Sequence, residues 1–250
     1  GEAVPFTPSL GVERKLRNWL KISGKVNKNY RLPTLNDLYW QPGGQPNLLP
    51  EKGWGEEVGA VFFIKKQRWS GSYTASVFNR SIKNWILWHP TDGQPWWSAS
   101  NIAEVWSRGI EQRVQWLWRR DFWRVKLNSG YDFIRSTNEK PLAVPKIEAG
   151  AQLIYVPEHQ AFAQATVQFR GAEISYLHHF TGSVSTELVS LPAFQTGTLR
   201  LEYETLLRNW QPHFFLTVEN LWNENYRVIE RRPMPGRYFR AGVSAAFSKN

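Results

Sequence analysis

Apolar and polar residues alternate along much of this chain with a period of two. The last such run places Phe239, Ala241, Val243, Ala245 and Phe247 on one side, and Tyr238, Arg240, Gly242 and Ser244 on the other. Similar runs begin at Phe122, Ala161 and Leu199, and Arg124 and Arg200 fall on the polar side of their runs. A period of two over about ten residues predicts a β-strand with one apolar and one polar face. Because the pattern recurs along the whole chain without a helical stretch, we predict an all-β protein.

The pattern predicts about eleven strands, near residues 4–10, 14–29, 55–65, 71–88, 101–119, 122–135, 146–156, 161–180, 197–206, 213–225 and 237–247. Short connections are expected near 11–13, 66–70, 119–121, 157–160 and 207–212, and long ones at 31–54, 89–100, 136–145, 181–196 and 227–236. Short turns at one end and long loops at the other are typical of an outer-membrane barrel. We expect each strand to pair antiparallel with its sequence neighbours in an up-and-down meander, with loops 31–54 and 227–236 at the same end.

Aromatic residues gather near the ends of the predicted strands: Trp85, Trp88, Trp116, Trp118, Trp123, Trp210, Phe214, Phe215, Tyr238 and Phe239. Amphipathic rings form girdles at the two interfaces of a membrane barrel. We therefore predict a transmembrane β-barrel in which the apolar face of the last strand contacts lipid, while Tyr238, Arg240 and Ser244 face the lumen. A soluble sandwich with an aromatic core is the alternative, because a soluble antiparallel sheet also alternates.

Composition narrows the classes of function. The 250 residues include no cysteine, which excludes disulfide frameworks, thiolate zinc sites and cysteine nucleophiles. The formal net charge is +10, but the basic residues are scattered and form no block of about five or six, so no nucleic-acid partner is predicted. No apolar run approaches the roughly 18 residues of a membrane-spanning helix, which excludes a helical membrane protein but not a barrel.

Catalytic and metal-binding patterns are missing from the sequence. It contains no Gly-x-Ser-x-Gly, no His-Glu-x-x-His and no phosphate-binding glycine loop. His178 and His179 are adjacent, so on a strand they point to opposite faces and cannot chelate one ion. We therefore predict no enzyme activity, no metal site and no cofactor.

The stretch from Asn29 to Gly59 carries three spaced blocks, which read NYRLPTLNDLYW, QPNLLPE and EEVG. Two X-Pro corners and a Pro-Gly-Gly turn interrupt it, so it cannot form one regular element. The blocks resemble the F-R-x-P-T-x-x-D-L-Y, N-P-x-L-x-P-E and E-x-G signature of TonB-dependent outer-membrane receptors, in the same order. Tyr30 stands in place of the family's Phe, and Gln45 in place of its Gly or Asn.

Further blocks downstream resemble the same family. Arg108-Gly109-Ile110-Glu111 is similar to its G-[IV]-E strand, the segment VENLWNENY at 218–226 to N-L-[FL]-[DN]-x-x-Y, and PGRYF at 235–239 to the opening of its last strand. Family members usually end on the final aromatic residue, whereas here Ser248-Lys249-Asn250 follow Phe247. The resemblance implies a Gram-negative outer-membrane receptor that imports a scarce solute, such as a siderophore, haem, cobalamin or a glycan, energised by TonB.

The resemblance also implies a barrel of about 22 strands around a plugged lumen. About eleven strands in 250 residues would be half of such a barrel. We therefore expect residues 1–250 to be the C-terminal part of the barrel, with the plug domain and the first strands absent and TonB contacted through that missing part. The expected shape is a curved open sheet, whose free edges at 4–10 and 237–247 are not hydrogen-bonded to each other.

Candidate ligand-binding residues lie in the predicted long loops. Arg227, Arg231 and Arg232, with Arg237, form the densest cationic group, which suits an anionic solute or the phosphates of lipopolysaccharide. Trp40, Trp96 and Trp97 lie in two other loops, where their rings could stack on sugar or catechol groups. Ordinary solvated charge and loop packing are the alternatives for both groups. The predicted partners are therefore TonB, a small-molecule ligand, and outer-membrane lipid including lipopolysaccharide.

Other functions remain open at this point. A passive porin-like barrel would share the alternation but need no plug. A soluble Trp-rich carbohydrate-binding β-protein would need no detergent. An outer-membrane enzyme is disfavoured, because no nucleophile and base can be paired in the sequence.

Overall fold

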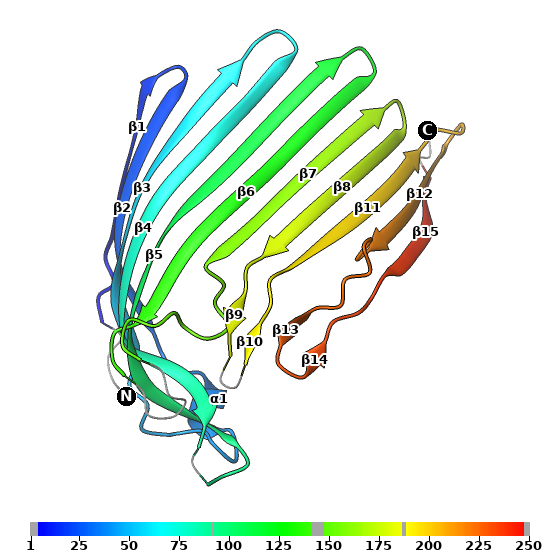
Figure 1. Cartoon of the computed structure of the whole chain (residues 1–250). Helices are drawn as coiled ribbons and strands as arrows, with labels where there is room; N and C mark the ends of the chain where they lie inside the picture. The colour runs from blue at the N-terminus through cyan, green and yellow to red at the C-terminus, as the bar shows by residue number, and fades with distance from the viewer. Residues whose placement is uncertain (1–4, 92, 142–147, 187–188, 248–250) are drawn as a thin grey trace.

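The computed structural model describes residues 5–91, 93–141, 148–186 and 189–247. The chain forms one strongly curved, open β-sheet with loops gathered at one end (Figure 1). Its elements are β1 (Ser9–Arg17), β2 (Leu20–Arg31), α1 (Leu35–Tyr39), β3 (Glu51–Lys65), β4 (Trp69–Pro90), β5 (Trp97–Arg120), β6 (Trp123–Asn138), β7 (His159–Phe169), β8 (Ala172–Thr181), β9 (Val184–Ser185), β10 (Ser190–Leu191), β11 (Phe194–Glu204), β12 (Trp210–Glu219), β13 (Arg227–Ile229), β14 (Arg232–Pro233) and β15 (Tyr238–Phe247). No helix in the described ranges is long and apolar enough to cross a membrane.

The sheet is an up-and-down meander of eleven antiparallel strands, in the order β1 to β8, β11, β12, β15. The hairpins β9–β10 and β13–β14 are separate two-stranded sheets within long connections. Figure 1 shows these hairpins, α1 and the tip of the β4–β5 hairpin at one end, and tight turns at the other. The predictions of a meander, of about eleven strands and of long loops sharing one end are confirmed.

The first hairpin differs from the prediction. Its turn forms at Asn18–Trp19, not at 11–13, and β1 runs without interruption through Gly11, which pairs with Lys25. The connection predicted near 11–13 was wrong, because these residues lie inside β1. The position of Gly11 opposite Lys25 shows that the glycine lies within a regular ladder that runs from Ser9 to Lys15, and the register shifts only between Lys15 and Arg17, next to the turn.

The region between β6 and β8 also differs. The prediction of a strand at 146–156 was wrong: residues 142–147 lie outside the described part, and the remainder contains only an isolated bridge between Gln152 and Thr137. The single strand predicted at 161–180 is two strands with a turn at Arg170–Gly171, so the short connection at 157–160 was wrong too. The apolar positions change from odd numbers to even numbers across this turn. One predicted strand does not form and another is two strands, so the predicted number of strands in the sheet is still correct.

The pairing register separates an apolar face from a polar face. Phe239 pairs with Val218, which pairs with Leu199, whereas Arg240 and Arg200 both pair with Thr217. Arg124 lies on the polar side as well, opposite Gln168. The predicted separation of the faces is confirmed.

The polar face is the concave one. Small polar side chains on it are buried although the sheet is a single layer, with Thr166 only 4% exposed, whereas Val243 on the apolar face is 67% exposed. Side chains converge on the inner side of a curved sheet and diverge on its outer side. The molecule therefore presents its apolar residues outward and its polar residues inward, the reverse of a soluble sandwich.

Aromatic rings line the apolar face at the short-turn end. Trp69 lies 4.7 Å from Trp116 between ring centroids, Trp123 lies 4.4 Å from Phe169, and Trp210 lies 5.3 Å from Phe247. Other predicted girdle residues lie elsewhere. Phe239 is on the apolar face at the long-loop end, and Tyr238 is on the polar face, where its hydroxyl donates to Glu219. Trp85 packs beside Val105 and Leu153, Trp88 contacts the α1 loop, and Phe215 lies on the polar face opposite Gly242.

The two edges of the sheet are β1 and β15, which are not paired with each other. The expected open sheet and its C-terminal edge are confirmed. The N-terminal edge is Ser9–Arg17 and not 4–10, because the first turn lies further along the chain.

Candidate functional site

The block at 29–40 folds into a short capped helix at the long-loop end. The Asp37 backbone N–H donates to Thr34 Oγ1 over 3.1 Å, and the Thr34 N–H donates to Asp37 Oδ2 over 2.8 Å. This reciprocal capping box satisfies two backbone donors that a helix start leaves free. The Leu32-Pro33 corner keeps the preceding chain extended, so α1 begins only at Leu35.

Asp37 joins this helix to the β4–β5 hairpin. Asp37 is only 6% exposed, and its carboxylate accepts a 2.8 Å hydrogen bond from Trp88 Nε1 and lies 3.9 Å from Arg31 Nη1. Burial by itself would raise the pKa of Asp37, but the hydrogen bonds from Thr34 and Trp88 and the charge of Arg31 hold the pKa below its ordinary value. The side chain is therefore a buried, satisfied carboxylate.

Glu51, at the start of β3, is a second buried carboxylate of the same group. It accepts from Arg31 Nε over 2.8 Å and from the backbone N–H of Ile86 over 2.9 Å, and a second guanidinium nitrogen of Arg31 completes a bidentate pair. Nearby, Asn101 bonds both the N–H and the C=O of Leu49. The loop from 32 to 50 is thus fastened to β4 and β5 at both ends.

The predicted loop tryptophans lie at this end of the sheet. The backbone of the loop that carries Trp40 comes into contact with the strand that carries Trp97. The backbone of Gly43, three residues after Trp40, accepts from Ala99 N over 2.9 Å. A Cβ at Gly43, whose φ is +130°, would lie 2.0 Å from the Trp97 carbonyl oxygen, so only glycine fits this close approach. Trp40, Trp96 and Trp97 are 58%, 36% and 43% exposed, and their rings are accessible from solvent.

The predicted arginines lie on the β13–β14 hairpin. Arg231 is in its turn, 3.6 Å from Glu230, while Arg227 and Arg232 are exposed and make no ion pair within the described residues. Thr186 Oγ1 donates to Glu230 Oε2 over 3.0 Å, which connects this hairpin to the β9–β10 loop. No contact in the described part of the chain joins these arginines to the tryptophans, so the two groups share an end but not a pocket.

The concave wall carries charged residues, several of which form ion pairs. Arg113 binds Asp132 through two hydrogen bonds of 2.5 and 2.9 Å. Arg240 lies 2.5 Å from Glu219, and Glu202 is bound by Arg200 and approached by His213 at 3.3 Å. A wet, charged inner wall of this kind suits a lumen rather than a hydrophobic core.

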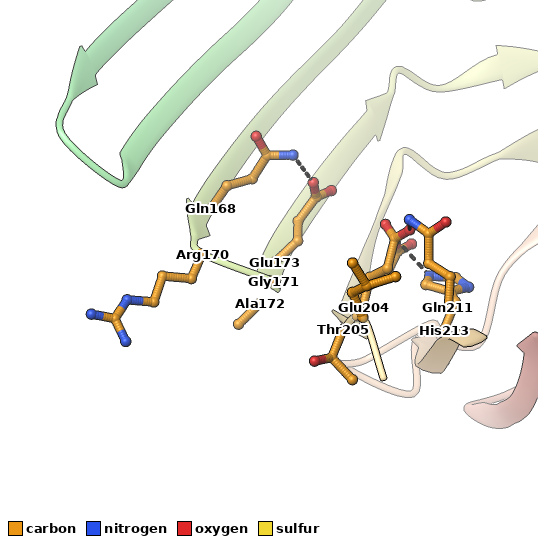
Figure 2. Close-up of a pocket in the computed structure, with 11 residues that line it drawn as sticks. Gln168, Arg170, Gly171, Ala172, Glu173, Glu204, Thr205, Gln211 and His213 are labelled. Atoms are coloured by element: carbon orange, nitrogen blue, oxygen red, sulfur yellow. Dashed lines mark hydrogen bonds and ion pairs between the residues drawn. The ribbon is translucent and has the colours of Figure 1, made fainter. Parts of the chain in front are cut away.

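A polar hollow of about 300 Å³ lies on this wall at the short-turn end, between the β7–β8 and β11–β12 turns. Figure 2 shows Glu173 hydrogen-bonded to Gln168, and Glu204 beside Gln211. Each carboxylate in it already has a side-chain partner. No group of three metal-ligating side chains is found in the described ranges, so the hollow offers no chelating set.

The chain also matches a known family. The family profile described as TonB dependent receptor-like, beta-barrel, matches residues 4–221. The chain belongs to this receptor family.

Relatives of the receptor chain include vitamin B12 transporters named BtuB. The one from Vibrio vulnificus is 30% identical over 105 residues, which cover 42% of this chain and 16% of the transporter. The one from Photobacterium profundum is 30% identical over 108 residues, covering 42% and 17%. The matched part of the receptor chain is thus under a fifth of each relative's length.

Solved structures of other proteins have the same fold. The copper transporter OprC superimposes with a TM-score of 0.72 at 15% identity, covering 94% of this chain and 38% of that one. The ferric-catecholate import receptor Fiu from E. coli K12 gives 0.68 at 20% identity, covering 95% and 34%. At these identities the likeness establishes the fold alone.

Arg31, Asp37 and Glu51 are the receptor residues whose role the sequence did not reveal. In the sequence, these three residues could be recognised only as members of the family signature. A sequence signal existed, since Arg31, Asp37 and Glu51 are the only charged residues in the sequence from 31 to 51. Their mutual contacts, however, depend on β4 residues far along the chain.

Proposed function

We propose that this chain is part of an outer-membrane receptor of a Gram-negative bacterium that imports a scarce solute by TonB-energised active transport. Membership of the receptor family, joined to a concave polar wall inside an apolar outer face, is the observation that carries the proposal. The plug domain and the strands that would close the barrel are proposed to belong to the parent protein. TonB, the solute and outer-membrane lipid are its proposed partners.

The proposed solute contacts are Trp40, Trp96, Trp97, Arg227, Arg231 and Arg232. Exposed indole rings provide flat surfaces for sugar or catechol rings, and a guanidinium fork matches carboxylate or phosphate. Arg227 and Arg232 carry no ion pair within the described residues, so their charge is available to a ligand. An anionic siderophore or a similar anionic solute is the class that this set favours.

An uptake assay tests the transport proposal. The natural gene product that contains these residues is produced in cells lacking their own receptors, with and without TonB, and offered labelled catecholate and hydroxamate siderophores, haem, cobalamin and copper. We expect saturable uptake of one class that disappears without TonB. Uptake that continues unchanged without TonB would identify a passive pore, and a protein soluble without detergent would identify a soluble β-module.

The arginine hairpin is tested with the variant Arg227→Gln, Arg231→Gln, Arg232→Gln. For an anionic solute we expect the Kd to rise about tenfold or more, because charge-assisted hydrogen bonds contribute roughly 1.5–3 kcal/mol each. The matched control replaces Arg68, Arg119 and Arg120 by Gln at the short-turn end and should leave the Kd unchanged. If both variants bound the solute with equal affinity, the hairpin arginines would be ordinary solvent-exposed charges that do not contact the solute.

A further inference from the structure

Two arginines lie directly opposite each other on neighbouring strands of the long-loop half. Arg108 of β5 pairs with Arg135 of β6. Like charges in a cross-strand pair destabilise a sheet unless something compensates them. On β3 and β4 a second such pair occurs, Lys52 opposite Lys83.

Both pairs lie on the outward face. Arg108 and Arg135 are each two residues from Ile110 and Phe133, which pair with each other on the apolar face. Lys52 is six residues before Val58 of the same face, which pairs with Val77. Since alternate residues of a strand share a face, these cations continue the apolar surface toward the loops.

The arginine pair lies at the height where the hydrocarbon core of the membrane meets the lipid headgroups. Along β6, positions 123 and 135 are separated by twelve residues, which at about 3.3 Å per residue and a tilt of about 40° is roughly 30 Å along the membrane normal. Trp123 belongs to the aromatic row at the short-turn end, and the outward apolar band is about 25 Å tall. The arginines therefore lie just beyond the band, where lipid headgroups begin.

The protein itself compensates these charges only in part. Arg108 stacks over the Trp106 ring at 3.6 Å and donates to Thr137 Oγ1 over 3.0 Å, but neither contact is anionic. Arg135 makes no hydrogen bond or ion pair with any described residue, and it is exposed. Three carboxylates share the surface: Glu56, which accepts from Asn79, Glu104, which binds Lys140 over 2.9 Å and feels the charge of Lys83, and Glu139, which accepts from Thr137 Oγ1 over 2.7 Å. The cations outnumber them.

We propose that Arg108, Arg135, Lys52 and Lys83 form a docking surface for the phosphates of a phosphorylated glycolipid in the outer leaflet. Guanidinium groups bind phosphate bidentately, and the acyl chains would lie on the exposed Val58, Val77 and Ile110, one cross-strand row that is two residues from Arg108 and six from the lysines. The Trp106 ring, 41% exposed beside Arg108, lies at the level of the sugar. This inference rests on the outer-membrane location proposed above, but not on solute import.

A lipid-binding experiment tests it on the natural gene product purified in detergent. The probes are lipid A carrying both phosphates, the same lipid after dephosphorylation, and inorganic phosphate. The variant is Arg108→Gln, Arg135→Gln. The matched control is Arg119→Gln, Arg124→Gln, which removes the other cross-strand arginine pair of β5 and β6, located on the polar face at the opposite end.

We expect phosphorylated lipid A to raise the melting temperature of the wild type and the control, and to bind the variant at least tenfold more weakly by native mass spectrometry. Dephosphorylated lipid should not distinguish the three proteins. Without lipid, Arg135→Gln alone should melt no lower than the wild type, because it breaks no hydrogen bond or ion pair within the described residues and removes a repulsion. If the double variant does not fold, Arg135→Gln alone, which breaks no contact, should still weaken binding.

Equal affinity of variant and wild type for phosphorylated lipid A would overturn the proposal. Inorganic phosphate that displaces the lipid completely at millimolar concentration would overturn it as well, in favour of a site for free anions. Uptake measured on the same variant separates the two proposals. A wild type that binds lipid A as expected but imports nothing contradicts only the transport proposal.

Discussion

At the residue scale, two buried carboxylates fasten the signature loop. Buried charges are tolerated when they are paired and hydrogen-bonded, and Asp37 and Glu51 receive bonds from Arg31, Trp88 and two backbone N–H groups. The block at 29–51 is therefore a structural clasp, and its role is to hold the Trp40 segment against the β4–β5 hairpin.

Asp37→Asn should loosen this clasp, because an amide cannot replace a carboxylate that accepts from both Thr34 and Trp88. We expect a local loss of about 1–3 kcal/mol, measured as faster hydrogen exchange of residues 32–50 after correction for intrinsic rates. Asp121→Asn, in an exposed turn at the opposite end, is the control and should change nothing there.

The same clasp should respond to acid. The folded-state pKa of Asp37 is lowered, so it lies below the unfolded value of about 3.9. The carboxylate's contribution is therefore complete above about pH 5 and is lost as the pH falls through the lower folded-state pKa. Protection of residues 32–50 should fall with acid in the wild type and vary less in Asp37→Asn. An equal acid response in the wild type and in Asp37→Asn would show that Asp37 is not the group responsible.

At the element scale, three glycines on the concave face lie under aromatic rings of the neighbouring strand. The pairs are Phe78 with Gly109, Phe162 with Gly130, and Phe215 with Gly242. A Cβ on any of these glycines would come within 2.9 Å of its ring. Such rings cover the bare glycine backbone on the crowded side of a curved sheet, which explains why large aromatics occur on an otherwise polar wall.

Gly130→Ala should be destabilising, because its Cβ would lie 2.4 Å from Phe162 Cε1 and 2.9 Å from Arg113 Cδ. We expect about 1–3 kcal/mol, measured by urea unfolding of the natural protein in micelles. Gly24→Ala is the matched control, since nothing lies within 4 Å of a Cβ there. It should be neutral or slightly stabilising, and equal losses at both positions would argue against ring packing as the cause.

At the scale of the whole molecule, the polarity of the two faces of the sheet is the reverse of that in a soluble protein. The exposed outer face of this sheet is apolar and its inner face is charged. That arrangement is stable only where lipid covers the outer face and water or polar protein fills the inner one.

Ala163→Arg tests this orientation, because Ala163 lies on the apolar face near the middle of β7. A charge at the bilayer midplane should cost roughly 2–4 kcal/mol, measured by unfolding from lipid vesicles. Gln164→Arg, one residue further and on the polar face, should cost far less. If Gln164→Arg proved the more damaging, the two faces would have been assigned the wrong way round.

The sequence by itself determined the class of fold, the two faces and the meander. Alternation is a property of neighbouring residues, so Phe239 and Arg240 reveal their opposite faces without any knowledge of the rest. The Arg170–Gly171 turn was also readable in principle, because the apolar positions change phase there. It was missed because alternation on each side continued without a gap, whereas the connection expected near 11–13 fell inside β1.

Only the tertiary structure decided which side chains meet. Trp88 and Asp37 are 51 positions apart, Ile86 and Glu51 are 35 apart, and no local pattern encodes contacts at that separation. The opposed pair of Arg108 and Arg135 likewise depends on the register of β5 against β6, since a slip of one residue would send one arginine to the other face. Register is set jointly by the turn and by burial along the whole strand pair, so the clasp and the outward cationic surface emerged only with the folded sheet.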